Sequence, residues 1–134
     1  MTMTRLWLVA ILMAAMGASA HAQANYTVEE IAEVREFEIV RFISSSVRES
    51  RGERIFEVLI RYADPDEAPP GGAASRKVRY RARCEAGEMA ISAIVLRNIN
   101  AQMLKVITVP PGGEEFARPD RSSRKSDWLY RVCG

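Results

Sequence analysis

The chain has 134 residues, of which 48% are hydrophobic and 27% are charged, and its formal net charge is +2. A chain of this length can form one domain around one core and is too short for two. Because it lacks the basic excess that is typical of nucleic-acid-binding domains, we do not expect nucleic acid as a partner.

The N-terminus has the composition of a secretory signal peptide. Arg5 supplies a positive charge before an apolar run of eleven residues, and small residues follow. We predict that residues 1–22 are the signal peptide and that cleavage follows Ala22, with cleavage after Ala20 as the alternative, so that one domain spans 23–134. The apolar run is too short to cross a bilayer. We therefore expect a periplasmic, secreted or cell-surface protein with no transmembrane segment in its mature chain.

The next residues predict a short helix and then a strand. Thr27 and Glu30 have the spacing of a capping box, which starts helices, although a strand is the competing interpretation. Residues 36–43 predict a strand in which the apolar positions change side once, as a bulge would cause. Five glutamates crowd this part of the chain, namely Glu29, Glu30, Glu33, Glu36 and Glu38.

Residues 44–74 predict a turn, a second strand and a loop. Three serines at 44–46 and a glycine turn at 51–53 follow the first strand. Residues 54–62 place apolar side chains at every second position, which is typical of a half-buried strand. The segment 64–74 holds three prolines and two glycines, so it predicts a loop.

Residues 77–84 alternate strictly and predict a half-buried β-strand. One side of this strand is apolar and holds Val78, Tyr80, Ala82 and Cys84. The other side is basic and holds Lys77, Arg79, Arg81 and Arg83. Four like charges in a row repel one another, so they need either acidic neighbours across the sheet, with Glu57 as a candidate, or a bound anionic or protein partner. Both alternatives stay open, and we predict that these four basic side chains bind the partner.

Two more strands are predicted after a turn at 85–87. Residues 88–98 and 101–109 are rich in Ile, Val, Leu and Met, and a hairpin turn separates them near 98–100. Apolar residues occupy both sides of the first of these strands, which leaves room for a homodimer. Two prolines and two glycines at 110–113 end the sheet.

The C-terminal residues change to a helical period, with Leu129, Val132 and Cys133 on one side. Three candidate N-cap residues lie upstream, namely Asp120, Ser122 and Ser123. A disulfide between Cys84 and Cys133 would join this helix to the central strand, and such a bond persists in an oxidising compartment. We predict an α+β fold, with an antiparallel sheet of about five or six strands and a C-terminal helix packed on one face.

Four segments of the chain form a recognisable succession. They are the aromatic strand and serine turn at 42–47, the strand at 55–60, the strand that ends in Cys84, and the terminal segment 128–133. In this succession the chain resembles the surface-adhesin protein E family over nearly the whole predicted domain. The resemblance implies a C-terminal helix that is disulfide-bonded across one face of the sheet, and it implies binding to host extracellular-matrix and serum proteins.

The sequence offers little catalytic chemistry. Its single histidine, His21, lies in the predicted signal peptide, so the mature chain can form neither a Ser-His-Asp triad nor a usual zinc site. Ser122 and Lys125 match a Ser-x-x-Lys spacing whose partner motifs are missing. Three acidic residues could bind a calcium ion, namely Asp64, Asp66 and Glu67. We interpret them instead as solvated side chains of a loop. We predict a protein that is not an enzyme and has no catalytic residues, metal or cofactor.

Three aromatic residues, Tyr62, Tyr80 and Trp128, are interpreted as parts of the core and its rim rather than as a ligand platform. The favoured function is an exported binding module of the bacterial envelope or surface that binds a protein or an anionic partner in the manner of an adhesin. The alternative is a periplasmic inhibitor or envelope accessory protein, similar to lysozyme inhibitors, that uses the loops 64–74 and 110–118. An enzyme is the least favoured class.

Overall fold

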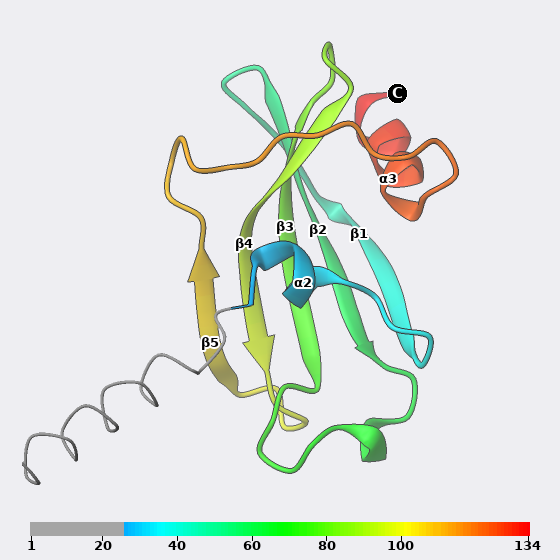
Figure 1. Cartoon of the computed structure of the whole chain (residues 1–134), viewed down its shortest axis with the longest axis vertical. Coiled ribbons are helices and arrows are strands. Elements are labelled where there is room, and N and C mark those ends of the chain that lie inside the picture. Colours follow the sequence, from blue (N-terminus) through cyan, green and yellow to red (C-terminus); the bar gives the residue numbers. More distant parts are fainter. Residues whose placement is uncertain (1–25) are drawn as a thin grey trace, which may run out of the picture.

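The computed structural model describes residues 26–134, and the predicted signal peptide lies outside the described residues. Five strands form one sheet in the order β1-β2-β3-β4-β5, each antiparallel to its neighbour (Figure 1). The elements in chain order are α2 (Val28–Ala32), β1 (Glu38–Ser50), β2 (Glu53–Tyr62), the 3₁₀ helix η1 (Pro65–Glu67), β3 (Ser75–Arg83), β4 (Glu88–Arg97), β5 (Met103–Thr108) and α3 (Arg124–Cys133). None of the described helices is long and apolar enough to cross a membrane. The predicted α+β fold is confirmed, with five strands.

The two α-helices of the described residues, α2 and α3, lie on one face of the sheet, which we call the helix-covered face (Figure 1). Alternate side chains of the central strands point to this face and form most of the core. Six of them are completely buried, namely Phe56, Val58, Ile60, Val78, Ala82 and Ile94. Ala32 of α2 and two residues of α3, Trp128 and Val132, complete the core. The opposite face, which we call the open face, carries neither of these helices.

Four aromatic rings cross the helix-covered face from β1 to α3. The ring centroids of Phe42 and Phe56 are 5.7 Å apart, and those of Phe56 and Tyr80 are 5.3 Å apart. The ring of Trp128 follows at 5.7 Å from that of Tyr80. These spacings suit offset or tilted aromatic pairs, which add stabilisation beyond the burial of their area. The row therefore ties α3 to the sheet.

The capping box at the start of α2 is confirmed, but the expected end of the first strand is wrong. β1 runs through the serines at 44–46 to Ser50, and its register with β2 shifts within the serine segment. The buried hydroxyl of Ser46 donates to the carbonyl of Ile43 and accepts from the amide of Glu57. The side chain thus supplies hydrogen bonds that a bulge removes from the ladder. The bulge predicted within residues 36–43 is wrong, because Glu38–Ile43 pair with β2 without interruption and the register shifts only between Ile43 and Arg48.

A second bulge lies in β4. Ile91 pairs with Tyr80 and Ala93 pairs with Arg79, so Ser92 is an extra residue between them. One extra residue reverses the parity of the strand beyond it. The apolar residues on both sides of the bulge therefore point to the helix-covered face, namely Met89, Ile91, Ile94 and Leu96. The bulge therefore explains why apolar residues occupy both sides of β4 in the sequence, and a second copy of the chain is not needed to cover them. The predicted homodimer loses this support and stays a prediction.

The predicted disulfide holds α3 to the end of β3. Cys84 and Cys133 are bonded across a sequence separation of 49 residues. The helix begins after Ser123, whose hydroxyl accepts a hydrogen bond from the amide of Ser126 and so caps a free N–H group. Both ends of the helix are therefore fixed, one by the cap and the other by the covalent bond.

The buried face of α3 is centred on an aromatic side chain. Trp128 and Val132 are its buried residues, and Leu129 is partly buried at the margin of the core. The sequence singles out Leu129 and Val132, because they continue the apolar period. Trp128 contributes the larger buried surface, since an aromatic ring reaches further over the sheet than a leucine does.

A buried ion pair fixes the segment between α2 and β1. Glu38 Oε2 lies 2.6 Å from Arg76 Nη1, and Glu38 Oε1 accepts from Arg76 Nη2 at 3.0 Å and from the Arg35 amide at 3.1 Å. The Glu38 side chain is only 1% exposed. Burial raises the pKa of the Glu38 carboxyl, but the hydrogen bonds and charge of Arg76, together with the Arg35 amide, outweigh it. The pKa is therefore held below its ordinary value of 4.5.

We expect Glu38→Gln to lower the free energy of unfolding by about 2 kcal/mol at neutral pH, because the charge-assisted hydrogen bonds to Arg76 are lost. A carboxyl with a lowered folded-state pKa contributes stability above its unfolded-state pKa and loses it as the pH falls through the folded-state value. The difference between wild type and variant should therefore shrink below pH 4.5. Urea unfolding at neutral and acidic pH measures this, and a difference that ignores pH would contradict it. Glu49→Gln, at an exposed position of β1, is the matched control.

Candidate functional site

The open face carries the predicted partner-binding residues, which we call the Arg row: Lys77, Arg79, Arg81 and Arg83. Glutamates of β2 lie beside three of them. Arg79 Nη2 is 3.5 Å from Glu57 Oε2. Glu53 serves two arginines, with Oε1 at 3.6 Å from Arg81 Nη1 and Oε2 at 3.5 Å from Arg83 Nε. The sequence prediction that Glu57 neighbours the row is confirmed.

The segment between β5 and α3 covers one end of the Arg row. Glu114 Oε1 lies 3.8 Å from Arg81 Nε, and the Arg83 guanidinium lies 3.6 Å from the centroid of the Phe116 ring. A cation over an aromatic face at this distance is attracted by the ring. Two backbone hydrogen bonds to Met89 hold this segment against β4. The three arginines of the row are therefore balanced by groups of the same chain.

The Arg row stays partly accessible. The side chains of Arg79, Arg81 and Arg83 are 45%, 31% and 51% exposed. Exposed ion pairs are worth less than about 1 kcal/mol each, so a partner can replace them at small cost. Lys77 forms no ion pair with the residues between 26 and 134. The acidic neighbours explain why the row is stable, and its role in partner binding stays a prediction.

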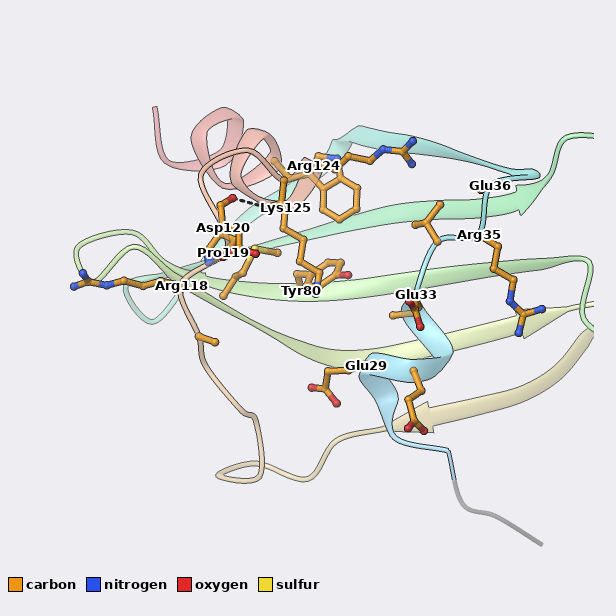
Figure 2. Close-up of a pocket in the computed structure, with 17 residues that line it drawn as sticks. Glu29, Glu33, Arg35, Glu36, Tyr80, Arg118, Pro119, Asp120, Arg124 and Lys125 are labelled. Carbon is orange, nitrogen blue, oxygen red and sulfur yellow. Dashed lines mark hydrogen bonds between the residues drawn. The ribbon is translucent and has the colours of Figure 1, made fainter.

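A cleft of about 860 Å³ lies on the helix-covered face, between α2 and the N-terminal end of α3 (Figure 2). We call it the α2–α3 cleft. Residues 29–36 form one wall and residues 117–125 contribute to the other, while Tyr80, Met89 and Trp128 lie at its floor. Clefts of about 300–1,000 Å³ that combine apolar surface with a few polar groups are typical of ligand sites.

The floor of the cleft holds a polar group without a partner. Tyr80 is 2% exposed, and its hydroxyl makes no hydrogen bond with any residue that the structure describes. In Figure 2 this hydroxyl points along the cleft toward the α2 side. Burial, and less strongly the charge of Glu29, raise the pKa of Tyr80, so the hydroxyl stays protonated and can donate. The hydroxyl oxygen itself is not fully buried, so it is accessible from the cleft and can donate a hydrogen bond to a ligand that binds there.

The two walls of the cleft carry opposite charge. The α2 wall holds Glu29, Glu30, Glu33, Glu36 and Arg35. The α3 wall holds Arg118, Arg124, Lys125 and Asp120. Within 26–134 no ion pair joins the walls. Arg118 donates to the Ala86 carbonyl at 3.1 Å and keeps its positive charge, while Arg124 and Lys125 add theirs beside the positive end of the helix dipole.

No family model, curated protein or solved structure matches this chain. The resemblance to the surface-adhesin protein E family therefore stays a prediction from the sequence.

Other residues that the sequence singled out have local roles. The Asp64 carboxylate accepts from the Asp66 amide at 3.0 Å and caps η1. Lys125 lines the α2–α3 cleft, whereas Ser122, its neighbour in the Ser-x-x-Lys spacing, does not. No group of three potential metal ligands gathers in the described part of the chain. The absence of catalysis and of cofactors stays a prediction.

Sequence reasoning missed the α2–α3 cleft. It interpreted Tyr80 and Trp128 as core aromatics, which their burial confirms, but nothing in the alternation of β3 shows that a hydroxyl would face a cleft. One signal was available. Glutamates crowd 29–38 and basic residues crowd 118–125, at opposite ends of the domain, and only the fold reveals that these clusters face one another.

Proposed function

We propose that this protein is an exported, non-enzymatic binding module of the bacterial envelope or surface, and that it holds a protein partner at the α2–α3 cleft. The observation that carries the proposal is the hydroxyl of Tyr80, which has no partner among the described residues and is accessible from a cleft whose walls differ in charge. Export is supported by the Cys84–Cys133 disulfide, since such bonds persist in oxidising compartments. The resemblance to adhesins agrees with a binding function.

A protein fits the cleft better than an anionic polymer does. Four glutamates line the α2 wall, so a polyanion that approached Arg124 and Lys125 would be repelled by the opposite wall. A protein segment can present both charges and an apolar side chain. A polyanion would instead meet the Arg row, where weak internal ion pairs compete with it.

The alternative, a periplasmic inhibitor or envelope accessory protein, would use the loops 64–74 and 110–118. Part of the second loop adjoins the cleft, because residues 117 and 118 line it. Exchange of the loop 64–74 for a glycine-serine segment separates the two functions. Partner binding that survives this exchange favours the cleft, and binding that is lost favours the inhibitor.

We expect Tyr80→Phe to weaken partner binding by about fivefold to tenfold, because one hydrogen bond to the partner is lost. The free energy of unfolding of this variant should stay unchanged, because the hydroxyl has no partner within the described chain. Surface plasmon resonance on a panel of extracellular-matrix proteins, with heparin as the polyanion, measures binding, and urea unfolding measures stability.

The control for this experiment is the triple variant Arg79→Ser, Arg81→Ser and Arg83→Ser, which alters the open face alone. It should keep binding to the protein partner and lose any binding to heparin. If Tyr80→Phe leaves binding unchanged, or if only the triple variant lowers it, the cleft is not the binding site and the Arg row takes its place.

A further inference from the structure

We infer that the α2–α3 cleft is built for a zwitterionic peptide, with its ammonium group against the α2 wall and its carboxylate against the first turn of α3. This inference rests on the proposed function and names the class of ligand. It follows from three features of the cleft, which are the unpaired charges of each wall, the apolar floor and the position of Tyr80.

The α2 wall offers carboxylates that no cation of the described chain neutralises. Glu29 and Glu33 form no ion pair there, whereas Glu30 already accepts from the amide of Thr27 at 2.9 Å. The backbone carbonyl of Glu33 is held by Arg76 at 3.0 Å, so this wall is fixed in place. Glu29 and Glu33 are exposed, so their carboxylates are accessible to an ammonium group that enters the cleft.

The α3 wall offers the matching anion site. Arg124 and Lys125 occupy the first turn of α3, and neither forms an ion pair within 26–134. Free N–H groups and the helix dipole add positive potential at this end of the helix. Asp120 also lines this wall and opposes it, so the attraction depends on the two basic side chains together.

The floor between the two walls suits a peptide rather than a free amino acid. Met89 and Trp128 supply apolar surface for a side chain, and the Tyr80 hydroxyl can donate to a peptide carbonyl. The volume of about 860 Å³ holds more than one residue. A ligand with both charges and an apolar centre can reach the carboxylates of one wall, the basic side chains of the other wall and the Tyr80 hydroxyl between them.

The test uses the full chain with Trp7→Phe, in which Trp128 is the only tryptophan and reports on the floor of the cleft. The probes are the tripeptide Ala-Phe-Ala with free termini, its N-acetylated form and its C-amidated form. We expect the free peptide to shift the Trp128 emission. Acetylation and amidation should each weaken binding by about fivefold, as the loss of one accessible ion pair does.

Charge variants then assign each terminus to its wall. Glu29→Gln with Glu33→Gln should abolish the effect of acetylation and keep that of amidation. Arg124→Gln with Lys125→Gln should do the reverse. The matched controls Glu49→Gln and Lys105→Gln remove exposed charges outside the cleft, and both effects should persist in them.

Equal binding of the free and blocked peptides, or no response to the free peptide at millimolar concentration, would overturn the ligand class. If the peptides fail in this way but Tyr80→Phe still weakens binding of a protein partner, the proposed binding function is supported and only the zwitterionic peptide is wrong as the ligand class. If the peptides behave as expected and no protein partner depends on Tyr80, the peptide site stands and the proposed capture of a protein fails.

Discussion

Replacement of Cys84 and Cys133 by alanine should lower the free energy of unfolding by about 4 kcal/mol. The bond closes a loop across a sequence separation of 49 residues, and the chain-entropy model assigns about this much to a loop of that length. A domain of this size has a total stability of about 5–15 kcal/mol, so the loss is a large share of it. Urea unfolding of the wild type and the double variant measures the change.

Reduction of the wild-type protein is the control for the double variant. Both should lose stability to a similar extent, since each removes the same covalent link. Two free thiols in the native protein, found by mass spectrometry without reductant, would contradict the bond itself. If the free energy of unfolding falls by less than about 1 kcal/mol in both samples, the disulfide constrains the unfolded chain only weakly and the expected effect is wrong.

Trp128→Ala should cost about 3–5 kcal/mol of unfolding free energy, as the truncation of a buried aromatic residue does. The Trp128 side chain is 7% exposed, and its ring lies 5.7 Å from that of Tyr80, so its removal opens a cavity between α3 and the sheet. Circular dichroism during urea unfolding follows the loss without relying on tryptophan fluorescence.

Tyr130→Ala is the matched control, because Tyr130 lies two residues further along the same helix and is 75% exposed. It should change the free energy of unfolding by less than about 0.5 kcal/mol, as most surface substitutions do. Similar losses from the two substitutions would mean that another face of α3 packs on the sheet.

The central strand β3 was predictable because its information is local. Successive side chains of a strand point to opposite faces, so strict alternation from Lys77 to Cys84 is enough to separate a buried face from a basic one. The helical period near the C-terminus and the capping box of α2 are local in the same sense. The pairing of Cys84 with Cys133 needed only the export signal and the count of two cysteines.

The bulge in β4 and the burial of Glu38 could not be predicted from the local sequence, because both depend on residues that are distant in the chain. Ser92 becomes an extra residue only because β3 pairs on both sides of it in register, so the parity of β4 cannot be taken from β4 alone. Glu38 resembles the solvated glutamates around it. It is buried because Arg76, which lies 38 residues away, meets it with two hydrogen bonds.

The amino-acid sequence by itself therefore determined the strands, the C-terminal helix and the covalent link between them, because periodicity and cysteine count act over a few residues or through a single bond. Only the tertiary structure decided which charges face one another. It set the glutamates of the α2 wall across from Arg124 and Lys125, with Tyr80 between them, because α2 and α3 pack on the same face of the antiparallel sheet. Charges attract through space rather than along the chain, so a site made of them exists only after folding.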